Sequence, residues 1–494
     1  MELMFGNETE YAFYFLGTRG SPRLLEMYLP QFMDFASSRL RHLPDVMARG
    51  FFLQNGSRFY LDHGLHPEIS TPECTNPWDG VRYTLAGDAI LSKLGKEFCS
   101  TCDPGAQVLI LKNNVDYSGE RTTWGSHESF LHKARPDHLP PQLIPHLVSR
   151  IIYCGAGGFN PFSASLSFVL APRAFHLQTA ISPDSTQNRG IFHTKDEPLS
   201  SGGYHRLHCI SGESLCSHTA SWLRIATTAL VVALAAAEIR PGDDVELVDP
   251  LAAMRNFASD PGLKALVAGG PKGQLSALEI QRHYLSLAEA HIGAPFFPSW
   301  AKEACQHWRA TLDMLEGSPE RAALTLDWAI KQSLFKRLVD RRGFQWEDLG
   351  KQTKKRTAEF EALRHDLLEL DVRFSQLGDG GLFADLDRDD LLTHEFVGVD
   401  NIEHAMENPP ASGRARVRGE CVRRLAGDAD NYLCDWHTVW ERATNRMLDL
   451  SDPFCTEERW REGPAVLTGL EEFERRMHLS GRIRYPSPGT GRGG

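Results

Sequence analysis

The sequence predicts an α+β protein with a large catalytic domain and a small C-terminal domain. Two observations support this prediction. Short strand-like runs alternate with loops early in the chain, and helical periodicity dominates after about residue 217. Runs of strands followed by runs of helices are typical of α+β folds. A chain of 494 residues has room for roughly two to four domains and a sizeable core.

The individual elements follow from local patterns. Apolar and polar residues alternate over Leu3–Phe13, which indicates a strand, and residues 22–49 have helical spacing. Phe51–Leu61 is typical of two strands joined at Asn55-Gly56, a hairpin signal. Further strands are expected at Val108–Leu111, Phe168–Leu170, Ile191–Thr194 and Arg206–Ile210, and helices at 217–238, 277–291, 298–316, 318–341 and 355–370.

A loop signal at 407–413, Glu-Asn-Pro-Pro-Ala-Ser-Gly, predicts the main domain boundary. We therefore expect a catalytic domain over 1–405 and a small C-terminal domain with helical patterning over 406–480. The segment 481–494 ends in a stretch rich in Pro, Gly and Ser, which is typical of a disordered tail.

Composition narrows the classes of function. The net charge of −11 argues against a general nucleic-acid-binding protein, whose surface is basic. The first residues lack the basic region of a signal peptide. The longest apolar stretch, Ile225–Ala237, is shorter than the ~20 residues of a membrane span and predicts a buried helix. Only Cys99 and Cys102 have CxxC spacing, for which ordinary reduced thiols are the simplest interpretation. We expect a cytoplasmic protein that uses neither nucleic acid nor membrane.

Two clusters of acidic residues suggest a metal site. Carboxylates two residues apart on a strand point to one face, so Glu8 and Glu10 are expected side by side. Like charges that close favour a bound cation, although a solvated sheet face is the alternative. Tyr60, Asp62 and Glu68 come from a polar cluster that follows an apolar strand, where Glu68 is a candidate third carboxylate for Mg²⁺ and Asp62 could support the ligands or act as a base. A polar loop with a His-Pro turn is the alternative there.

Later segments supply amides and cations. Asn113 and Asn114 follow a strand, where they could hydrogen-bond a nucleotide or form ordinary Asx turns. Lys195 and Arg206 could neutralise phosphate charge, and His208 alternates with Arg206 on a strand, although a structural histidine is the more common role. Together these clusters make up the inventory of a metal–nucleotide site. No Walker A or kinase-type Gly-rich loop is present, so ATP would bind by another architecture.

Arg414, Arg416 and Arg418 form a local basic concentration near the predicted domain junction. They could grip phosphates or an acidic partner, and a solvated basic face is the alternative.

The clusters, in this order, resemble the family of the prokaryotic ubiquitin-like protein (Pup) ligase and its sister, the Pup deamidase/depupylase. The resemblance covers residues 4 to about 455. It rests on Gly6-Asn-Glu8-Thr-Glu10-Tyr11, Asn55-Gly-Ser-Arg-Phe-Tyr60-Leu-Asp62-His-Gly-Leu-His66-Pro-Glu68, Lys112-Asn-Asn-Val-Asp116, Gly125-Ser-His127-Glu128, Thr194-Lys195-Asp-Glu-Pro198, His205-Arg206-Leu-His208, Leu326-Asp-Trp-Ala-Ile-Lys331, Arg414-Ala-Arg416-Val-Arg418-Gly-Glu420 and Cys434-Asp-Trp436.

The resemblance implies a glutamine-synthetase-like large domain, whose curved antiparallel sheet cradles ATP and Mg²⁺, plus a small C-terminal domain. It implies that the metals and phosphates are surrounded by Glu8, Glu10, Tyr60, Glu68, His127 and His208. Asp62 matches the catalytic aspartate. In a ligase, ATP would phosphorylate a substrate γ-carboxylate, a lysine amine would attack the acyl phosphate, and Asp62 would act as the base. In the deamidase the matching aspartate is tied to cleavage of an amide bond.

Several features bear on the choice between the sister activities and on the substrate. The short spacing from Tyr11 to Asn55 and the run after Asp62 favour the ligase branch, whereas His63 is deamidase-like. The family pattern is broken at Lys195, Leu215, His218, Arg373 and Phe374. Four alternatives therefore stay open: a ligase that joins Pup or a Pup-like protein to an amine, the same chemistry with a small carboxylate donor or peptide, a depupylase-type hydrolase, and a weakly catalytic nucleotide-binding paralog.

Overall fold

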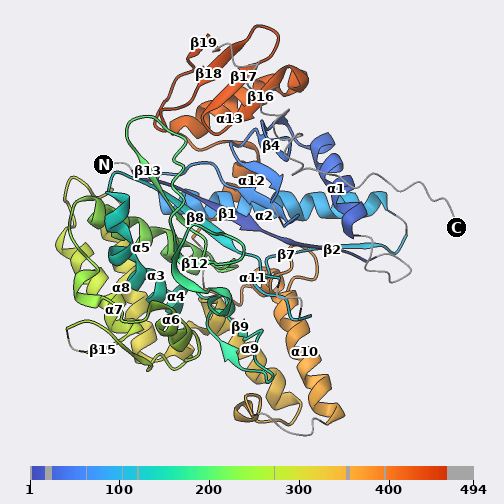
Figure 1. The fold of residues 1–494 in the computed structure, drawn as a ribbon. Coiled ribbons are helices and arrows are strands. Elements are labelled where there is room, and N and C mark those ends of the chain that lie inside the picture. Colours follow the sequence, from blue (N-terminus) through green and yellow to red (C-terminus); the bar gives the residue numbers. More distant parts are fainter. Residues whose placement is uncertain are drawn as a thin grey trace, which may run out of the picture.

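A nine-stranded sheet runs through the centre of the protein (Figure 1). The structure is a computed structural model that describes residues 3–16, 25–62, 64–102, 104–119, 122–271, 273–351, 357–393 and 396–463. The strands lie in the order β11 (Thr179–Ser182), β12 (Gly190–His193), β13 (His205–Cys209), β8 (Ser126–His132), β1 (Met4–Glu10), β6 (Pro67–Ser70), β5 (Arg58–Leu61), β4 (Gly50–Leu53) and β3 (His42–Pro44). Neighbours are antiparallel except for β11 and β12.

The alternation of side chains gives this sheet one apolar and one polar face. On β1, Phe5 is buried in the main core, whereas Glu8 and Glu10 are only partly buried. On β8, Phe130 joins the same core, and Glu128 on that side is neutralised by ion pairs with buried arginines. One face of the sheet therefore packs against the core, and the other face carries polar side chains.

Helices cover the apolar face. They are α2 (Pro77–Thr101), α3 (Leu139–Ser149), α4 (Ile151–Cys154), α5 (His218–Ala236), α6 (Pro250–Ala258), α7 (Ala277–Ala290) and α8 (Ala301–Gly317). Asn76 caps α2 by accepting a hydrogen bond from the Asp79 N–H, and Pro77 occupies its first turn. Glycine lets α2 approach the strands, because a Cβ at Gly87 would lie 3.1 Å from Ile69. The glycines of α2 also explain why the sequence does not predict this helix, because glycine lowers helix propensity.

Helix α5 is long and apolar enough to pass a test for a membrane span based on length and composition. Within the protein, however, 89% of its apolar window is buried. A core helix passes the same test, and the expected buried helix over Ile225–Ala237 lies within and directly after α5.

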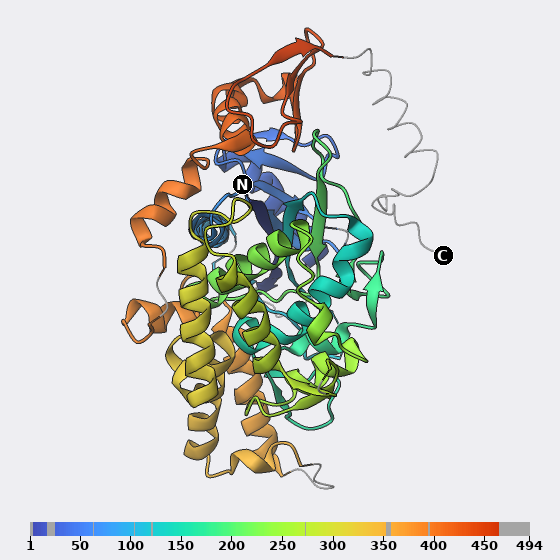
Figure 2. The ribbon, with the colours of Figure 1, turned by 90° about the vertical axis from the view of Figure 1, so that its left-hand side faces the viewer.

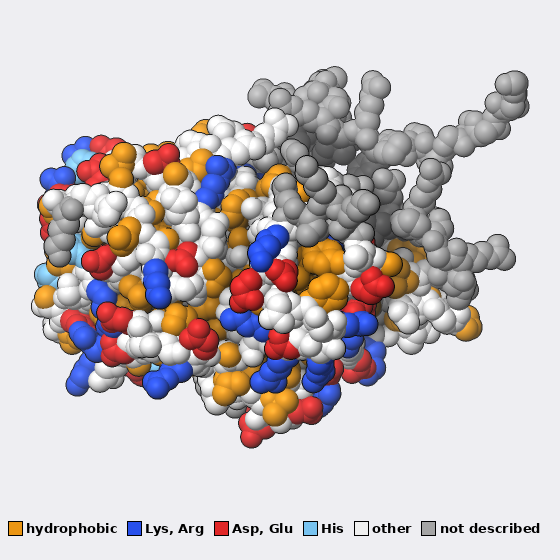
Figure 3. Space-filling model, turned by 90° about the horizontal axis from the view of Figure 1, so that it is seen from below, with side chains coloured by type: hydrophobic (Ala, Val, Ile, Leu, Met, Phe, Trp, Pro, Cys, Tyr) orange, Lys and Arg blue, Asp and Glu red, His pale blue; other side chains and the backbone are white. Residues whose placement is uncertain are grey.

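Smaller elements extend the body of the protein. The ribbon of β2 (Ala12–Leu16) and β7 (Gln107–Leu111) packs with α1 (Leu25–Arg39) in a second core. Below the sheet in Figure 1 lie α9 (Asp327–Arg341), α10 (Ala358–Phe374) and α11 (Leu382–Arg388), and the face seen from below carries intermingled charges of both signs (Figure 3). The remaining strands are β9 (Gly158–Phe159), β10 (Phe168–Val169), β14 (Leu266–Ala268) and β15 (Gln274–Ser276).

The C-terminal part sits on the β3–β4 end of the sheet (Figure 2). After α12 (Val399–Glu407), which packs on α2, the chain forms α13 (Gly413–Leu425) and an antiparallel sheet of β16 (Tyr432–Asp435), β17 (Thr438–Glu441), β18 (Arg446–Asp449) and β19 (Trp460–Glu462). Its core residues contact Leu43 and Phe52 of the large domain. The predicted helical patterning is therefore wrong for most of this part, because strands of three or four residues are too short to show a period of two.

Other predictions are partly corrected. The hairpin at Asn55-Gly56 is confirmed. The helix expected over 22–49 is wrong beyond Arg39, where α1 ends and β3 soon follows. The helix expected over 318–341 is a short 3₁₀ segment and then α9. The expected tail, 481–494, lies outside the described residues, as does the end of the expected C-terminal domain.

Candidate active site

Strand register places the predicted metal ligands on the polar face of the sheet. Glu8 is the cross-strand partner of His127 on β8, and Glu10 is the partner of Glu68 on β6. Glu68 in turn pairs with Tyr60 on β5. Because cross-strand partners share a face, these side chains form one continuous patch over four neighbouring strands.

The first cluster on this face consists of Glu8, His127 and His208. The three ligand atoms lie within 4.8 Å of one another. Glu8 Oε2 is 3.6 Å from His127 Nδ1 and 4.0 Å from His208 Nε2. The Ser129 hydroxyl lies 3.1 Å from His208 Nδ1 and fixes the orientation of the ring.

The second cluster consists of Glu10, Asp62 and His66, which also offer ligand atoms within 4.8 Å of one another. Asp62 begins a tight turn between β5 and β6, where its Oδ1 accepts a hydrogen bond of 2.7 Å from the His66 N–H. His66 Nδ1 lies 3.2 Å from Asp62 Oδ2. The expected catalytic aspartate thus lies among the candidate metal ligands.

Crowding of negative charge dominates the electrostatics of this face. Burial raises the pKa of Glu68 well above its ordinary value, and the charges of Glu8 and Glu10 raise it further. Burial also acts to raise the pKa of Glu8, but His208, His127 and Arg206 outweigh it and the net shift is downward. Burial together with Glu68 and Glu8 raises the pKa of the Tyr60 hydroxyl. Such a patch favours cations.

In the Asp62–His66 pair, each group favours the charged form of the other. Burial acts to raise the pKa of Asp62, but the hydrogen bonds and charge of His66 lower it overall. Burial acts to lower the pKa of His66, but Asp62 and Glu10 raise it overall. Asp62 is therefore held as a carboxylate, which could accept a proton.

Two arginines that sequence reasoning missed stand near Glu10. Arg173 is 3% exposed, and its guanidinium donates to Thr123 and to the Ile210 carbonyl. A Cβ at Gly125 would lie 2.7 Å from Arg173 Nη2 and 3.0 Å from His127 Nε2, so the glycine lets both groups approach. Arg189 interacts electrostatically with Glu10 and Asp62. Neither arginine lies in a motif, and the polar loop around Arg189 carries no sequence signal for a site.

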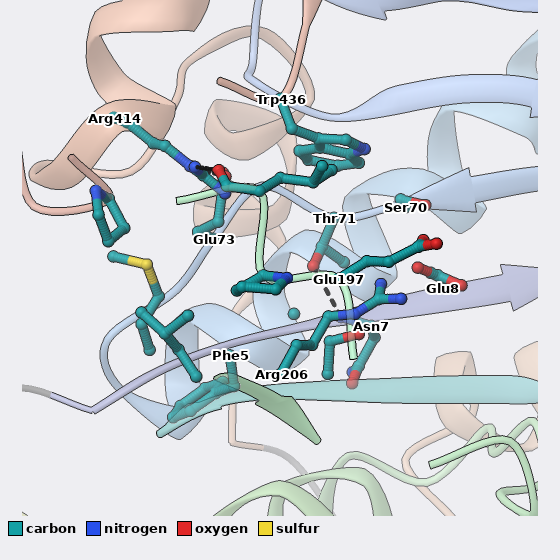
Figure 4. A pocket seen from close by; sticks show the side chains of 17 residues that line it. Phe5, Asn7, Glu8, Ser70, Thr71, Glu73, Glu197, Arg206, Arg414 and Trp436 are labelled. Carbon is teal, nitrogen blue, oxygen red and sulfur yellow. Dashed lines mark hydrogen bonds and ion pairs between the residues drawn. The ribbon is translucent and has the colours of Figure 1, made fainter. Parts of the chain in front are cut away.

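A pocket joins the polar face to the C-terminal part (Figure 4). It encloses about 630 Å³ of empty space, including solvent at its mouth. Glu8 and Arg206 line the end at the sheet, and Arg414 and Trp436 line the opposite end. The loop between β12 and β13 contributes Glu197. The pocket could take an elongated ligand with an anionic end.

Some predicted ligand-binding side chains are engaged elsewhere. Asn114 is buried, and its amide exchanges hydrogen bonds with the backbone of Ser214. Asn113 accepts a hydrogen bond from the Ser375 hydroxyl. Lys195 is half exposed and pairs with Glu197. The polar groups of these three residues have protein partners in this structure, and their contact with nucleotide stays a prediction.

The basic segment 414–418 also has protein partners. Arg418 is fully buried and pairs with Glu73 at 2.5 Å. Arg414 Nε pairs with the same carboxylate at 2.6 Å, although its side chain also borders the pocket. Arg416 lies on the outer surface and pairs with Glu420. Arg418 and Arg416 thus have carboxylate partners within the protein, and the role of the segment in gripping phosphates or an acidic partner stays a prediction.

Comparison with known proteins identifies the family. A profile of the Pup-ligase protein family matches residues 4–440. The chain is 33% identical over 506 aligned residues to a Pup–protein ligase of Brachybacterium faecium, with 98% of each chain covered. It is 33% identical over 404 residues to a Pup deamidase/depupylase of Mycolicibacterium smegmatis, which covers 80% of this chain and 76% of that protein.

Solved structures agree in fold. The crystal structure of Pup with its ligase PafA matches with a TM-score of 0.78 and 23% identity, over 100% of this chain and 98% of that one. PafA in complex with ADP matches with a TM-score of 0.70 and 24% identity, over 93% and 95% of the two chains. The predicted α+β fold class, with a large sheet and a small C-terminal part, is confirmed. The chain belongs to the Pup-ligase protein family.

Proposed function

We propose that this chain is an ATP-dependent carboxylate–amine ligase, which joins the γ-carboxylate of Pup or a Pup-like donor to a lysine amine. The observation that carries the proposal is the polar sheet face with two candidate metal clusters beside a pocket that reaches the C-terminal part. The Pup–protein ligase of Brachybacterium faecium supports the proposal, because the alignment covers 98% of this chain and 98% of that protein.

The donor atoms of the polar face fit divalent cations. Glu10, Glu68, Asp62 and Tyr60 offer oxygens, and Glu8, His127 and His208 offer one carboxylate and two imidazoles. Bound metal would shield the charge on the ATP phosphates. The pairing of three carboxylates on adjacent strands is costly without such a cation, which supports the use of Mg²⁺ with ATP.

The pocket suggests how ATP lies. An aromatic side chain is a suitable platform for a base, so we place the nucleoside near Trp436 and the phosphates toward Arg206 and Glu8. Arg173 and Arg189 stand beyond, next to Glu10, where fixed positive charge would stabilise the transferred phosphoryl group.

The chemistry then has two balanced steps. A donor carboxylate oxygen attacks the γ-phosphorus, the bond from that phosphorus to the bridging oxygen breaks, and ADP leaves. The amine nitrogen attacks the acyl carbon, the bond from carbon to the phosphate oxygen breaks, and inorganic phosphate leaves. Asp62 takes the amine proton, because its hydrogen bonds from His66 hold it ionised at the edge of the cluster.

The hydrolase is the second candidate, because the depupylase of M. smegmatis is as similar in identity. Coverage favours the ligase, since the depupylase alignment spans 76% of that protein and the ligase alignment 98%. Only two residues separate α1 from β3, which leaves little room there for an inserted loop.

We also propose a cytoplasmic location. Cys74, Cys154 and Cys209 are buried as thiols, which suits a reducing compartment. A lysine-bearing protein and Pup, or a small carboxylate donor, are the expected partners.

Release of ADP with hydroxylamine as the amine acceptor tests the proposal. The full-length chain with Pup ending in glutamate should form ADP and a hydroxamate in equal amounts, because hydroxylamine traps an acyl phosphate. Pup ending in alanine is the matched control and should give neither product. Cleavage of a Pup conjugate without ADP formation would favour the hydrolase and contradict the proposal.

A further inference from the structure

One buried carboxylate, that of Glu213, lies outside both clusters of the polar face. Glu213 is 4% exposed and lies between β13 and α5. Its Oε1 accepts a hydrogen bond of 2.7 Å from the Arg173 N–H, and its Oε2 accepts one of 2.7 Å from the Ala156 N–H. The two oxygens therefore hold the backbone of segments that lie 40 and 57 positions earlier in the chain.

The segment that carries Glu213 is itself fixed at its backbone. Arg224 on α5 donates a hydrogen bond to the Glu213 carbonyl. Asn114 exchanges hydrogen bonds of 2.7 Å and 3.0 Å with the backbone of Ser214. The carboxylate therefore projects from a base that side chains of other elements hold in place.

Arg173, the first partner of this carboxylate, carries its charge to the polar face. It lies in the 3₁₀ turn Pro172–His176, and its guanidinium donates hydrogen bonds of 2.8 Å to Thr123 and to the Ile210 carbonyl. The guanidinium also interacts electrostatically with Glu10. Because the carboxylate binds the backbone N–H of Arg173 itself, a shift of that hydrogen bond would move the guanidinium relative to Glu10.

Packing alone does not account for a carboxylate at this position. Burial raises the pKa of Glu213 to about 7, although the two N–H groups, Arg173 and Lys331 act to lower it. The ionised side chain is therefore costly in the folded chain, and carboxylates perturbed in this way cluster at functional sites. A cavity with about 300 Å³ of empty space also borders the side chain, so its hydrogen bonds, more than close packing, set its position.

We infer that Glu213 is a positioning residue for phosphoryl transfer, whose carboxylate fixes the backbone of Arg173 so that the guanidinium stands beside Glu10, where the γ-phosphate of ATP would meet it. The inference rests on the proposed function, which places Arg173 next to the transferred group. Glu213 touches no substrate in this role and acts through Arg173 alone. The role matters for the rate, because a misplacement of about 1 Å can cost about 10²-fold.

Nucleotide affinity tests this assignment without turnover. Calorimetry in Mg²⁺ compares β,γ-methylene-ATP, which has a γ-phosphate, with ADP, which lacks it. Arg173→Met should weaken binding of the analogue by about 10- to 150-fold, the contribution of one hydrogen bond to a charged group, and change ADP binding little. Glu213→Gln keeps the shape but replaces one acceptor oxygen by an NH₂ group, so it should weaken binding of the analogue by at least about 5-fold.

A double variant separates positioning from general destabilisation. If Glu213 acts only through Arg173, Glu213→Gln should change analogue affinity by less than about 2-fold once Arg173→Met is present. Glu279→Gln is the matched control, because this carboxylate also accepts a backbone N–H, that of Ser276, but caps α7 outside the site, and it should bind both nucleotides normally. Far-ultraviolet circular dichroism checks folding. Glu213→Asp, which keeps the charge but has a shorter reach, should also weaken the analogue selectively and serves if Glu213→Gln does not fold.

Equal affinity of the wild type and the Glu213 variant for the analogue, or additive losses in the double variant, would overturn the assignment. The measurement contains neither donor nor amine. A chain that shows the selective, non-additive loss but forms no hydroxamate would refute only the proposed ligase activity. Hydroxamate formation by a chain that shows no selective loss would refute only the role of Glu213.

Discussion

At the scale of single residues, the turn that holds Asp62 fixes the position of the proposed base. Its carboxylate receives the His66 N–H and lies beside the His66 ring, so the side chain is fixed before a substrate arrives. A base held in this way loses little freedom in the transition state. Its distance from the amine is then set by where the donor binds.

Asp62→Asn keeps the shape and the hydrogen bond from the His66 backbone but removes the proton acceptor. We expect the rate of hydroxamate formation to fall by about 10²- to 10⁴-fold, the usual contribution of general-base catalysis. The dissociation constant for ADP, measured by calorimetry, should change little because the pocket is intact. Asp313→Asn, an exposed change on α8, is the control. Equal rates in the Asp62 variant and the wild type would contradict the role.

A separate prediction concerns the positive charge of Arg189. Arg189→Gln removes a positive charge that faces Glu10 and Asp62 and should lower the rate of ADP formation by roughly 10²-fold, as loss of one transition-state donor does. Arg189→Lys should recover part of the rate, because charge survives while the planar fork is lost. Steady-state kinetics measure both variants, with the exposed Arg240→Gln as control. Full activity of Arg189→Gln would remove this residue from the site.

Only part of the site could be predicted from the sequence. The period of two in strands places Glu8 and Glu10 on one face, and the hairpin signal at Asn55-Gly56 is local chemistry. Arg173 and Arg189 approach Glu10 through the packing of distant segments, so no local pattern marks them. Arg418 looks like a phosphate ligand in sequence, yet its partner Glu73 lies 345 positions away.

At the scale of elements, ion pairs hold α13 against the segment between β6 and α2, which carries Glu73. Arg414 and Arg418 both grip Glu73, and Arg418 also donates to the carbonyls of Gly56 and Trp436. Gly56 permits this approach, since its φ of +85° suits glycine and a Cβ there would lie 3.0 Å from the Ala415 carbonyl. Loss of one partner would leave a buried charge uncompensated, at a cost of about 3–5 kcal/mol.

We call the ion pairs of Glu73 with Arg414 and Arg418 the lock, and its contribution to the free energy of unfolding should depend on pH. Burial acts to raise the pKa of Glu73, but Arg418 and Arg414 lower it overall from 4.5 to about 2. The stabilisation is therefore complete above the unfolded-state pKa and is lost as the pH falls from 4.5 toward 2, by about 3 kcal/mol in all. Urea unfolding between pH 6 and pH 3 should show the difference between wild type and Glu73→Gln shrinking over this range. Glu420→Gln, a change on the exposed side of α13, should show no such trend. A difference that stays constant with pH would contradict the ionised lock.

At the scale of the whole molecule, the pocket needs both parts of the chain. The sheet supplies Glu8 and Arg206, and the C-terminal part supplies Arg414 and Trp436. Arg418 holds the indole from behind, with its guanidinium 4.8 Å from the ring centre and 5.4 Å from that of Phe52. The lock that joins the two parts therefore also shapes the end of the pocket where we place the nucleotide base.

This arrangement predicts that nucleotide binding and docking of the C-terminal part are coupled. Trp436→Ala should raise the dissociation constant for ADP by about 5- to 150-fold, because stacking of a base on an aromatic ring contributes about 1–3 kcal/mol. Trp460→Ala is the control, since that side chain packs at the edge of the same small sheet, bonded to Glu458 and away from the pocket. In wild type, ADP should slow amide hydrogen exchange in β16 and β17 as well as in β1, because a ligand that binds only the docked form stabilises it. Protection confined to β1, with ADP affinity unchanged in Trp436→Ala, would mean that the sheet alone holds the nucleotide.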